Sequence, residues 1–184
     1  MEHEPKEVLI KSEVNTLFDL WENGDLPGYL HNTLTFFLGA CYTGGDYETF
    51  QLFSMANVTQ TADGGTFVYK RVKSERTSGK IVRVPITERC VRIFKDIDRR
   101  ALRVISTQRF NDYLKQIMKI ADIEKSMSTH CGRHSFAVIH LNELGTPMEM
   151  VSDLLGHSSI NITRKHYARF LDSAKRTQMR KFDE

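Results

Sequence analysis

Apolar residues recur at helical spacing along most of this chain. Between residues 8 and 21 they repeat every three to four positions, which predicts an amphipathic helix closed by Gly24 and Pro27. From Tyr29 to Tyr42 nearly every position is apolar. A helix that is apolar all round is expected to be central and buried.

Strand periodicity appears in the middle of the chain. Residues 66–73 and 81–86 are rich in β-branched and aromatic side chains and flank the polar turn from Ser74 to Lys80, a pattern typical of a β-hairpin. The period of two puts Arg71 and Lys73 on the same face. Both cations are therefore expected to point the same way.

The remainder is predicted to be helical. Thr146, Pro147 and Glu149 supply an N-cap, a proline at the first helical position and a capping-box acid, so a helix is expected to start there and run to Gly156. Helical periodicity also marks Val91–Phe94, Phe110–Ile120 after a possible cap at Ser106, His130–Leu144, and a last stretch through Tyr167. The expected fold class is mostly α with a small antiparallel β-sheet (α+β), in a single domain over residues 1–184.

Composition narrows the class of protein. The chain has 184 residues, 40% of them hydrophobic and 27% charged, which suits a globular domain with a real core. No apolar run approaches the roughly 18 to 20 residues of a membrane span. Three widely separated cysteines indicate neither a disulfide framework nor a zinc ribbon. A location in the cytoplasm of a bacterium is expected.

Charge is unevenly distributed although the net charge is only +3. Residues 70–119 hold fifteen Lys and Arg against five Asp and Glu, and residues 157–184 hold seven against three. Two basic segments separated by neutral to acidic ones are what a face for a polyanion requires. Ordinary solvated helix surface explains the same charges equally well.

One stretch carries the chemistry. His130, Arg133 and His134 are spaced i, i+3 and i+4, so on a helix they are expected to share a face. Two imidazoles and a guanidinium can cradle a phosphate. His157 follows in a Leu-Gly-His run, and Tyr167 comes ten residues later. A tyrosine hydroxyl, with an ordinary pKa of about 10, needs a nearby base or an electropositive site to act as a nucleophile.

The run from His130 to Tyr167 closely resembles the signature of tyrosine recombinases, the phage-type integrases: His-x-x-Arg-His, then Leu-Gly-His, then tyrosine. Upstream, Tyr42-Thr-Gly-Gly-Asp46 is similar to the family's Thr-Gly-x-Arg segment, and Lys73 to its β-hairpin lysine. The resemblance spans nearly the whole chain and implies the family's catalytic-domain fold, with the usual N-terminal DNA-clamping domain absent from this chain.

The resemblance implies a role for each matching residue. Tyr167 attacks a DNA phosphate to leave a 3′-phosphotyrosine link, and Arg133 stabilises the transition state. His130 and His157 donate hydrogen bonds to the phosphate. His134 positions or deprotonates the tyrosine, and Lys73 protonates the departing 5′-oxygen. The implied reaction is site-specific DNA recombination, as by the integrase of a mobile element, without ATP, metal or another cofactor.

One position departs from the family pattern. Asp46 stands where the first arginine is expected. A carboxylate there would repel the phosphate, and the loss of the guanidinium would cost roughly a few kcal/mol of transition-state stabilisation. We expect Arg71 to supply the missing charge from the hairpin. Integrases of Bacteroidetes mobile elements resemble this chain in lacking that arginine, and a cleavage-dead relative is the alternative.

Two other interpretations stay open. Residues 146–170 also fit a helix-turn-helix, which would make the chain a non-enzymatic DNA-binding module. A metal site of His130, Cys131 and His134 fits helical zinc spacing, but the Glu of His-Glu-x-x-His is missing, so no metal site is predicted. His31, His140 and His166 fit no motif position and are interpreted as surface or packing residues.

Double-stranded DNA is the expected partner, with no membrane and no small-molecule substrate. A synaptic tetramer is expected on DNA and a monomer without it. The segment after Tyr167 is expected to pack either on a neighbouring protomer or on its own core. The cations expected to contact the phosphate backbone are Lys70, Arg76, Lys80, Arg83, Arg99 and Arg100.

Overall fold

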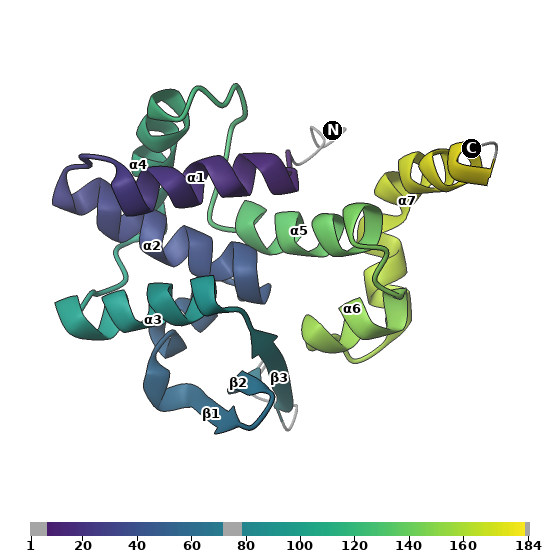
Figure 1. Ribbon diagram of the computed structural model, residues 1–184, viewed down its shortest axis with the longest axis horizontal. Helices are drawn as coiled ribbons and strands as arrows, with labels where there is room; N and C mark the ends of the chain where they lie inside the picture. The colour runs from purple at the N-terminus through teal and green to yellow at the C-terminus, as the bar shows by residue number, and fades with distance from the viewer. Residues whose placement is uncertain (1–6, 72–78, 183–184) are drawn as a thin grey trace.

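The computed structural model describes residues 7–71 and 79–182. Within these residues the chain forms a helical body with one small sheet (Figure 1), so the predicted mostly α fold with a small antiparallel sheet is confirmed. In chain order the α-helices are α1 (Lys11–Asn23), α2 (Gly28–Thr43), α3 (Glu88–Arg100), α4 (Thr107–Ile120), α5 (Cys131–Val138), α6 (Met148–Leu154) and α7 (Ile160–Phe182).

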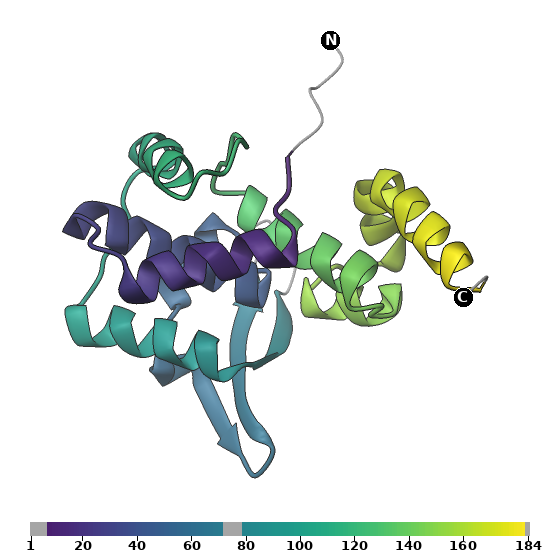
Figure 2. The same cartoon turned by 45° about the horizontal axis from the view of Figure 1, so that its top comes forward.

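The sheet contains the predicted hairpin and one strand more. Strands β2 (Gly64–Arg71) and β3 (Lys80–Ile86) pair antiparallel, and β1 (Val58–Thr61) joins the other edge of β2. Strand β1 was not predicted, because its four residues are mostly polar and exposed. The turn between β1 and β2 extends beyond the helices (Figure 2).

Register fixes the direction of Arg71. Tyr69 pairs with Val82, and Arg71 pairs with Lys80, so these side chains lie on one face of the hairpin. Tyr69 and Val82 are buried, which makes this the inner face. Arg71, at the end of β2, is therefore directed toward the body of the protein.

Helix α2 is the centre of the larger core. It packs against α1, α3, α4 and α5, and most of its residues are buried, as its uniformly apolar sequence predicts. This core, which also includes the inner face of the sheet, fixes the end of α2 and the start of α5 relative to β2.

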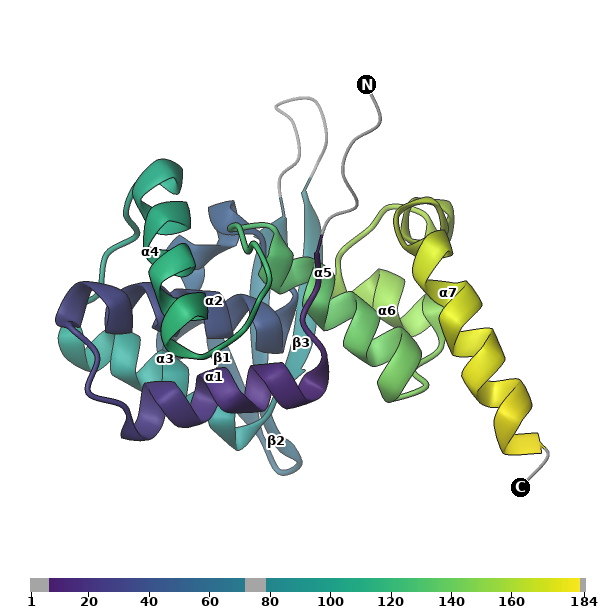
Figure 3. The same cartoon turned by 90° about the horizontal axis from the view of Figure 1, so that it is seen from above.

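A smaller core lies between α5, α6 and α7. It consists of Phe136, Ala137, Val138, Val151, Leu155 and Tyr167. Helices α6 and α7 lie at one end of the molecule, away from α3 and α4, and α7 runs outward from the body (Figures 1 and 3). No helix among the described residues is long and apolar enough to cross a membrane.

The start of α6 corrects one prediction. Pro147, not Thr146, occupies the N-cap position, and the helix shows no side-chain cap. The Thr146 hydroxyl is instead 3.0 Å from Nδ1 of His140. Between α5 and this point the chain widens into a π-helical turn, η3 (Ile139–Glu143), so the predicted helix to Leu144 is not a regular α-helix throughout.

Candidate active site

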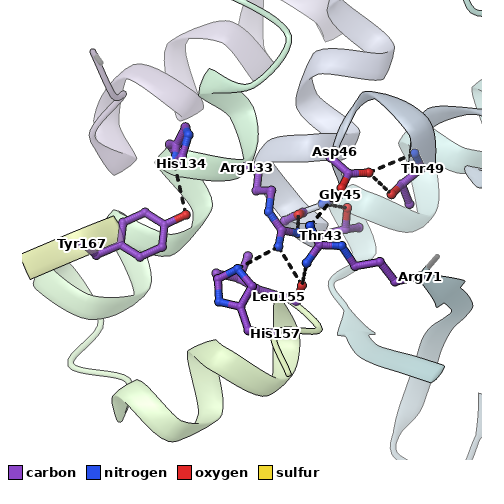
Figure 4. A network of polar contacts seen from close by, with 11 residues as sticks. Thr43, Gly45, Asp46, Thr49, Arg71, Arg133, His134, Leu155, His157 and Tyr167 are labelled. Carbon is purple, nitrogen blue, oxygen red and sulfur yellow. Dashed lines mark hydrogen bonds and ion pairs between the residues drawn. The ribbon is translucent and has the colours of Figure 1, made fainter. Parts of the chain in front are cut away.

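Arg133 is the centre of a polar network between α2, α5 and α6 (Figure 4). Its guanidinium donates from Nη1 to the carbonyl of Gly44 at 2.6 Å and from Nη2 to the carbonyl of Leu155 at 2.7 Å. Only 7% of Arg133 is exposed. Burial, followed by the charge of Arg71, lowers its pKa from the ordinary value, but an arginine remains charged near neutral pH.

Arg71 reaches the same backbone carbonyl from the hairpin. Its Nη1 donates to the Leu155 oxygen at 2.7 Å, and its Nη2 donates to Oδ2 of Asp46 at 3.2 Å. The structure thus brings the two guanidinium groups together on one oxygen. Nε of Arg71 is buried and has no hydrogen-bond partner among the described residues.

Two glycines with positive φ shape the backbone that supplies these carbonyls. Gly44, with φ 71°, ends α2, and a Cβ there would lie 2.8 Å from side-chain atoms of Leu155 and Phe136. Gly156, with φ 65°, follows Leu155, and a Cβ there would lie 2.5 Å from Val82. Glycine permits both the left-handed turns and the close approach of α2, α6 and the hairpin.

His157 joins the network after that turn. Its Nε2 is 3.2 Å from Nη2 of Arg133, and its Nδ1 is 2.7 Å from the hydroxyl of buried Thr163. Because a guanidinium can only donate, Nε2 accepts in this arrangement. We therefore assign the imidazole proton to Nδ1, which donates to Thr163.

Tyr167 lies on α7 and contacts His134 on α5. Its hydroxyl is 3.1 Å from Nδ1 of His134, and the tyrosine is 1% exposed. Burial raises the pKa of Tyr167 to about 12, although the charges of Arg133 and Arg71 act in the opposite direction. The phenol is accordingly neutral near pH 7, and His134 is the base in contact with it. Figure 4 shows Tyr167 and His134 on one side of Arg133, and Asp46 and Arg71 on the other.

The three motif residues at the start of α5 have different contacts. Arg133 turns to the α2 and α6 carbonyls, whereas His134 turns to Tyr167. His130, at the N-cap position of α5, is exposed and lines a cavity of about 340 Å³ that Asp46 and Arg71 also line.

Asp46 is paired, which the sequence analysis did not foresee. Oδ1 accepts from the Thr49 hydroxyl at 2.6 Å and from the Thr49 backbone N–H at 3.2 Å, while Oδ2 accepts from Arg71. Burial alone would raise the pKa of Asp46. The Thr49 hydrogen bonds and the charges of Arg133 and Arg71 hold this pKa below its ordinary value instead. The carboxylate is therefore ionised at neutral pH.

Two of the predicted cations, Lys73 and Arg76, lie outside the described residues. Lys80 is exposed, and its Nζ donates to the His157 carbonyl and to Asp153, both at 3.0 Å. It lies beside the network described above.

The other predicted DNA contacts lie elsewhere. Lys70 and Arg83 are exposed on the hairpin face opposite Arg71. At the end of α3, Arg99 donates to Oδ1 of Asp96 at 2.6 Å and Arg100 donates to the same oxygen at 2.9 Å. The site residues predicted from sequence thus divide into a central network and separate surface positions.

Some groups of the site carry no sequence signal. The Gly44 and Leu155 carbonyls are backbone atoms that any residue supplies. Thr163 lies within the segment between two motif residues, and only its distance from His157 identifies it. Tyr69 is 5% exposed, and burial raises its pKa although Arg133 lies close to it.

Two of the histidines without a motif position, His31 and His140, act in packing. His31 lies 3.0 Å from Asp96 and stacks on Trp21, and His140 lies against Phe136. Cys131 is buried, with its sulfur near Ser128. Across the described part of the chain, no group of three or more His, Cys, Asp or Glu is arranged to hold a metal ion.

The fold is that of tyrosine recombinase catalytic domains. The catalytic domain of bacteriophage HP1 integrase superposes with a TM-score of 0.59 at 21% identity, over 94% of this chain and 95% of that domain. XerH site-specific recombinase, in a post-cleavage complex with its difH substrate, gives a TM-score of 0.70 at 15% identity, over 95% of this chain and 53% of XerH. Tn1549 transposon integrase, in complex with a circular intermediate DNA, superposes with a TM-score of 0.65 at 14% identity, over 97% of this chain and 67% of the integrase chain.

The sequence itself places the chain in a family. The phage integrase family profile matches residues 66–173, more than half of the chain, so this protein belongs to the phage integrase family. Tyrosine recombinase XerD of Halalkalibacterium halodurans is 42% identical over 62 residues, which are 34% of this chain and 20% of XerD. The chain thus aligns with a fifth of that relative and spans about half of XerH.

Proposed function

We propose that this protein cuts and rejoins double-stranded DNA in site-specific recombination, as the catalytic domain of a mobile-element integrase. The observation that carries the proposal is the meeting of Arg133 and Arg71 on the Leu155 carbonyl, with His157 bonded to Arg133. Next to Arg133 on α5, His134 contacts Tyr167 of α7. Membership of the phage integrase family supports the reaction class. The XerH and Tn1549 structures, which contain DNA, support double-stranded DNA as the substrate.

In the proposed reaction, the Tyr167 oxygen forms a bond to a backbone phosphorus and the bond from phosphorus to the 5′-oxygen breaks. The products are a 3′-phosphotyrosine and a free 5′-hydroxyl. A later attack by a 5′-hydroxyl reverses the step, so the bond energy is kept and no ATP is consumed. His134 is in position to take the phenol proton, and Lys73 protonates the leaving oxygen.

Two guanidinium groups stabilise the pentavalent phosphorus in this proposal. Arg133 and Arg71 are fixed by hydrogen bonds before DNA arrives, so the site needs little reorganisation as charge develops on the phosphate oxygens. The unpartnered Nε–H of Arg71 provides a donor for such an oxygen. His130 and His157 supply further hydrogen bonds. To donate from Nε2, His157 must both release Arg133 and gain a proton on Nε2, because that nitrogen accepts from Arg133 in the free protein.

DNA would approach along the exposed cations. Lys70, Lys80, Arg83, Arg99 and Arg100, together with Arg76, are the proposed backbone contacts, and binding should weaken steeply as salt rises. We further propose that four copies assemble on DNA and that the chain is monomeric without it, as a single catalytic domain over residues 1–184 used together with a DNA-clamping domain.

A nicked DNA substrate tests the proposal. After cleavage the short 5′-hydroxyl fragment diffuses away, so a covalent complex accumulates and resists denaturing gel electrophoresis. We expect this complex with the unaltered protein in the presence of a chelator, and none with Tyr167→Phe. DNA binding without any adduct would favour the non-enzymatic module, and loss of the adduct on chelation would favour a metal-dependent enzyme.

A further inference from the structure

Asp46 faces the two arginines of the site, Arg71 and Arg133, which together form the cation cluster. The two oxygens of its carboxylate have separate partners. Oδ1 accepts both hydrogen bonds from Thr49 and caps the short 3₁₀ helix η1 (Tyr47–Leu52). Those two bonds fix the plane of the carboxylate. Oδ2 is thereby directed to Nη2 of Arg71, 3.2 Å away. The side chain of Asp46 is 19% exposed and that of Arg71 is 10% exposed, so solvent screens this pair only in part.

Arg71 needs such a partner because of where its guanidinium lies. Its Nη1 and Nη2 of Arg133 each lie 2.7 Å from the Leu155 oxygen, so the two cations cannot be farther apart than twice that distance at these atoms. Like charges this close repel, and the lowered pKa of Arg133 has Arg71 as its second cause after burial. One neutral carbonyl shared by two cations does not offset that repulsion.

Arg71 also stands at the end of its strand. It is the last residue of β2, and its described hydrogen bonds go to Leu155 and Asp46. A flexible side chain at that position gains entropy by turning to water. Asp46 opposes the release of the Arg71 side chain in two ways. Its negative charge attracts the guanidinium, and the Thr49 hydrogen bonds fix the orientation of the carboxylate.

From these contacts we propose that Asp46 is a positioning residue that holds Arg71 beside Arg133, so that both guanidinium groups are fixed before the phosphate binds. This inference rests on the proposed function for its consequence in catalysis, but not for the placement of Arg71. The negative charge of Asp46 also offsets part of the positive charge of the cation cluster, and both guanidinium groups stay in the site as fixed donors.

Asp46→Asn separates this role from a structural one. Asparagine is as good an N-cap as aspartate, so its oxygen can keep the Thr49 bonds while the charge that attracts Arg71 is lost. Thr49→Val is the matched control, because it removes the hydroxyl bond to Oδ1 and leaves the charge pair. The single-turnover rate of adduct formation, the Kd for DNA and the thermal midpoint are measured for Asp46→Asn, Thr49→Val, Arg71→Ala, Asp46→Glu and the double variant of Asp46→Asn with Arg71→Ala.

The expected pattern is specific. Asp46→Asn slows adduct formation on the order of tenfold, a fraction of the loss for removing a donor outright, with little change in Kd or thermal midpoint. Asp46→Glu recovers part of the rate, and Thr49→Val has a smaller effect than Asp46→Asn. The double variant is no slower than Arg71→Ala alone. An unaltered rate in Asp46→Asn, or losses that multiply in the double variant, would overturn the proposal.

A second measurement does not depend on cleavage. ¹⁵N relaxation of the Arg71 Nε–H in DNA-free protein, assigned by its disappearance in Arg71→Lys, reports the mobility of the guanidinium. We expect a rigid Nε–H in the unaltered protein and a mobile one in Asp46→Asn. Equal rigidity in both would refute the positioning role. If the unaltered protein forms no DNA adduct while Asp46→Asn still releases Arg71, the proposed function fails and the positioning role stands.

Discussion

The two sides of the candidate active site rest on hydrophobic cores of very different size. The arginine side, with Arg71, Asp46 and the end of α2, is attached to the large core around α2 and the sheet. Tyr167 belongs to the small core between α5, α6 and α7. An element with few buried apolar contacts opens at lower free-energy cost than one in a large core. The difference indicates that the cations are fixed, whereas the nucleophile is on the part of the fold that moves more easily.

The largest effect is expected on the fixed side. Arg133→Ala should reduce the rate of adduct formation about 10²- to 10³-fold, the usual loss for one transition-state donor, and also lower the free energy of unfolding, since the Gly44 and Leu155 carbonyls lose their donors. Arg133→Lys keeps the charge but not the two-pronged hydrogen bonding of a guanidinium. It should recover only part of the rate of adduct formation and part of the free energy of unfolding. Quench-flow assays and urea unfolding measure the two effects. Cleavage by Arg133→Ala at the normal rate would remove Arg133 from the reaction.

Gly44 joins the two cores, and substitution there should destabilise both. Gly44→Ala places a Cβ against Phe136 and Leu155 at a φ of 71°, which should cost about 2–4 kcal/mol of unfolding free energy through strain and overpacking. Gly28→Ala is the control, because nothing lies within 4 Å of its added Cβ, and it should change stability by less than about 1 kcal/mol. Equal stability of the two variants in urea unfolding would show that Gly44 is not a point of close packing.

A matched pair of valines distinguishes the two cores by function. Val151, in the small core, and Val84, in the large one, are both buried, so replacement of either by alanine should cost roughly 1.5 kcal/mol for two methyl groups. Below the unfolding transition, only Val151→Ala should alter the rate of adduct formation, because α7 carries Tyr167 and the connection between α6 and α7 carries His157. Identical changes in both variants would mean that the small core has no special link to the nucleophile.

The smallest expected effect concerns the hydrogen bond behind His157. Thr163→Val keeps the shape of a buried side chain but removes the hydroxyl that bonds to Nδ1. The loss of one such bond, about 1 kcal/mol, should slow cleavage about three- to tenfold, whereas Thr163→Ser should behave like the unaltered protein. If Thr163→Val retains the full rate, the orientation of His157 does not depend on this contact.

Residue periodicity was sufficient for the predicted helices and hairpin because each buries an apolar face. The same period of two puts Arg71 on the face of Tyr69, and the register shows this to be the inner face of the hairpin. It could not reveal that Asp46 would be paired, since that contact joins residues 25 positions apart in sequence. The role of the Leu155 carbonyl could not be predicted from sequence either, because every residue type has the same backbone acceptor. The misplaced cap of α6 has a local cause, because the Thr146 hydroxyl contacts His140, six residues earlier in η3, and does not cap the helix.

Peptide mapping of the covalent DNA adduct shows directly whether Tyr167 is the nucleophile. The protein is trapped on a nicked substrate and digested, and mass spectrometry identifies the residue attached to the 3′-phosphate. We expect a single modified peptide that carries the phosphate on Tyr167. Attachment to another residue, such as Tyr69 beside the same arginines, would contradict it.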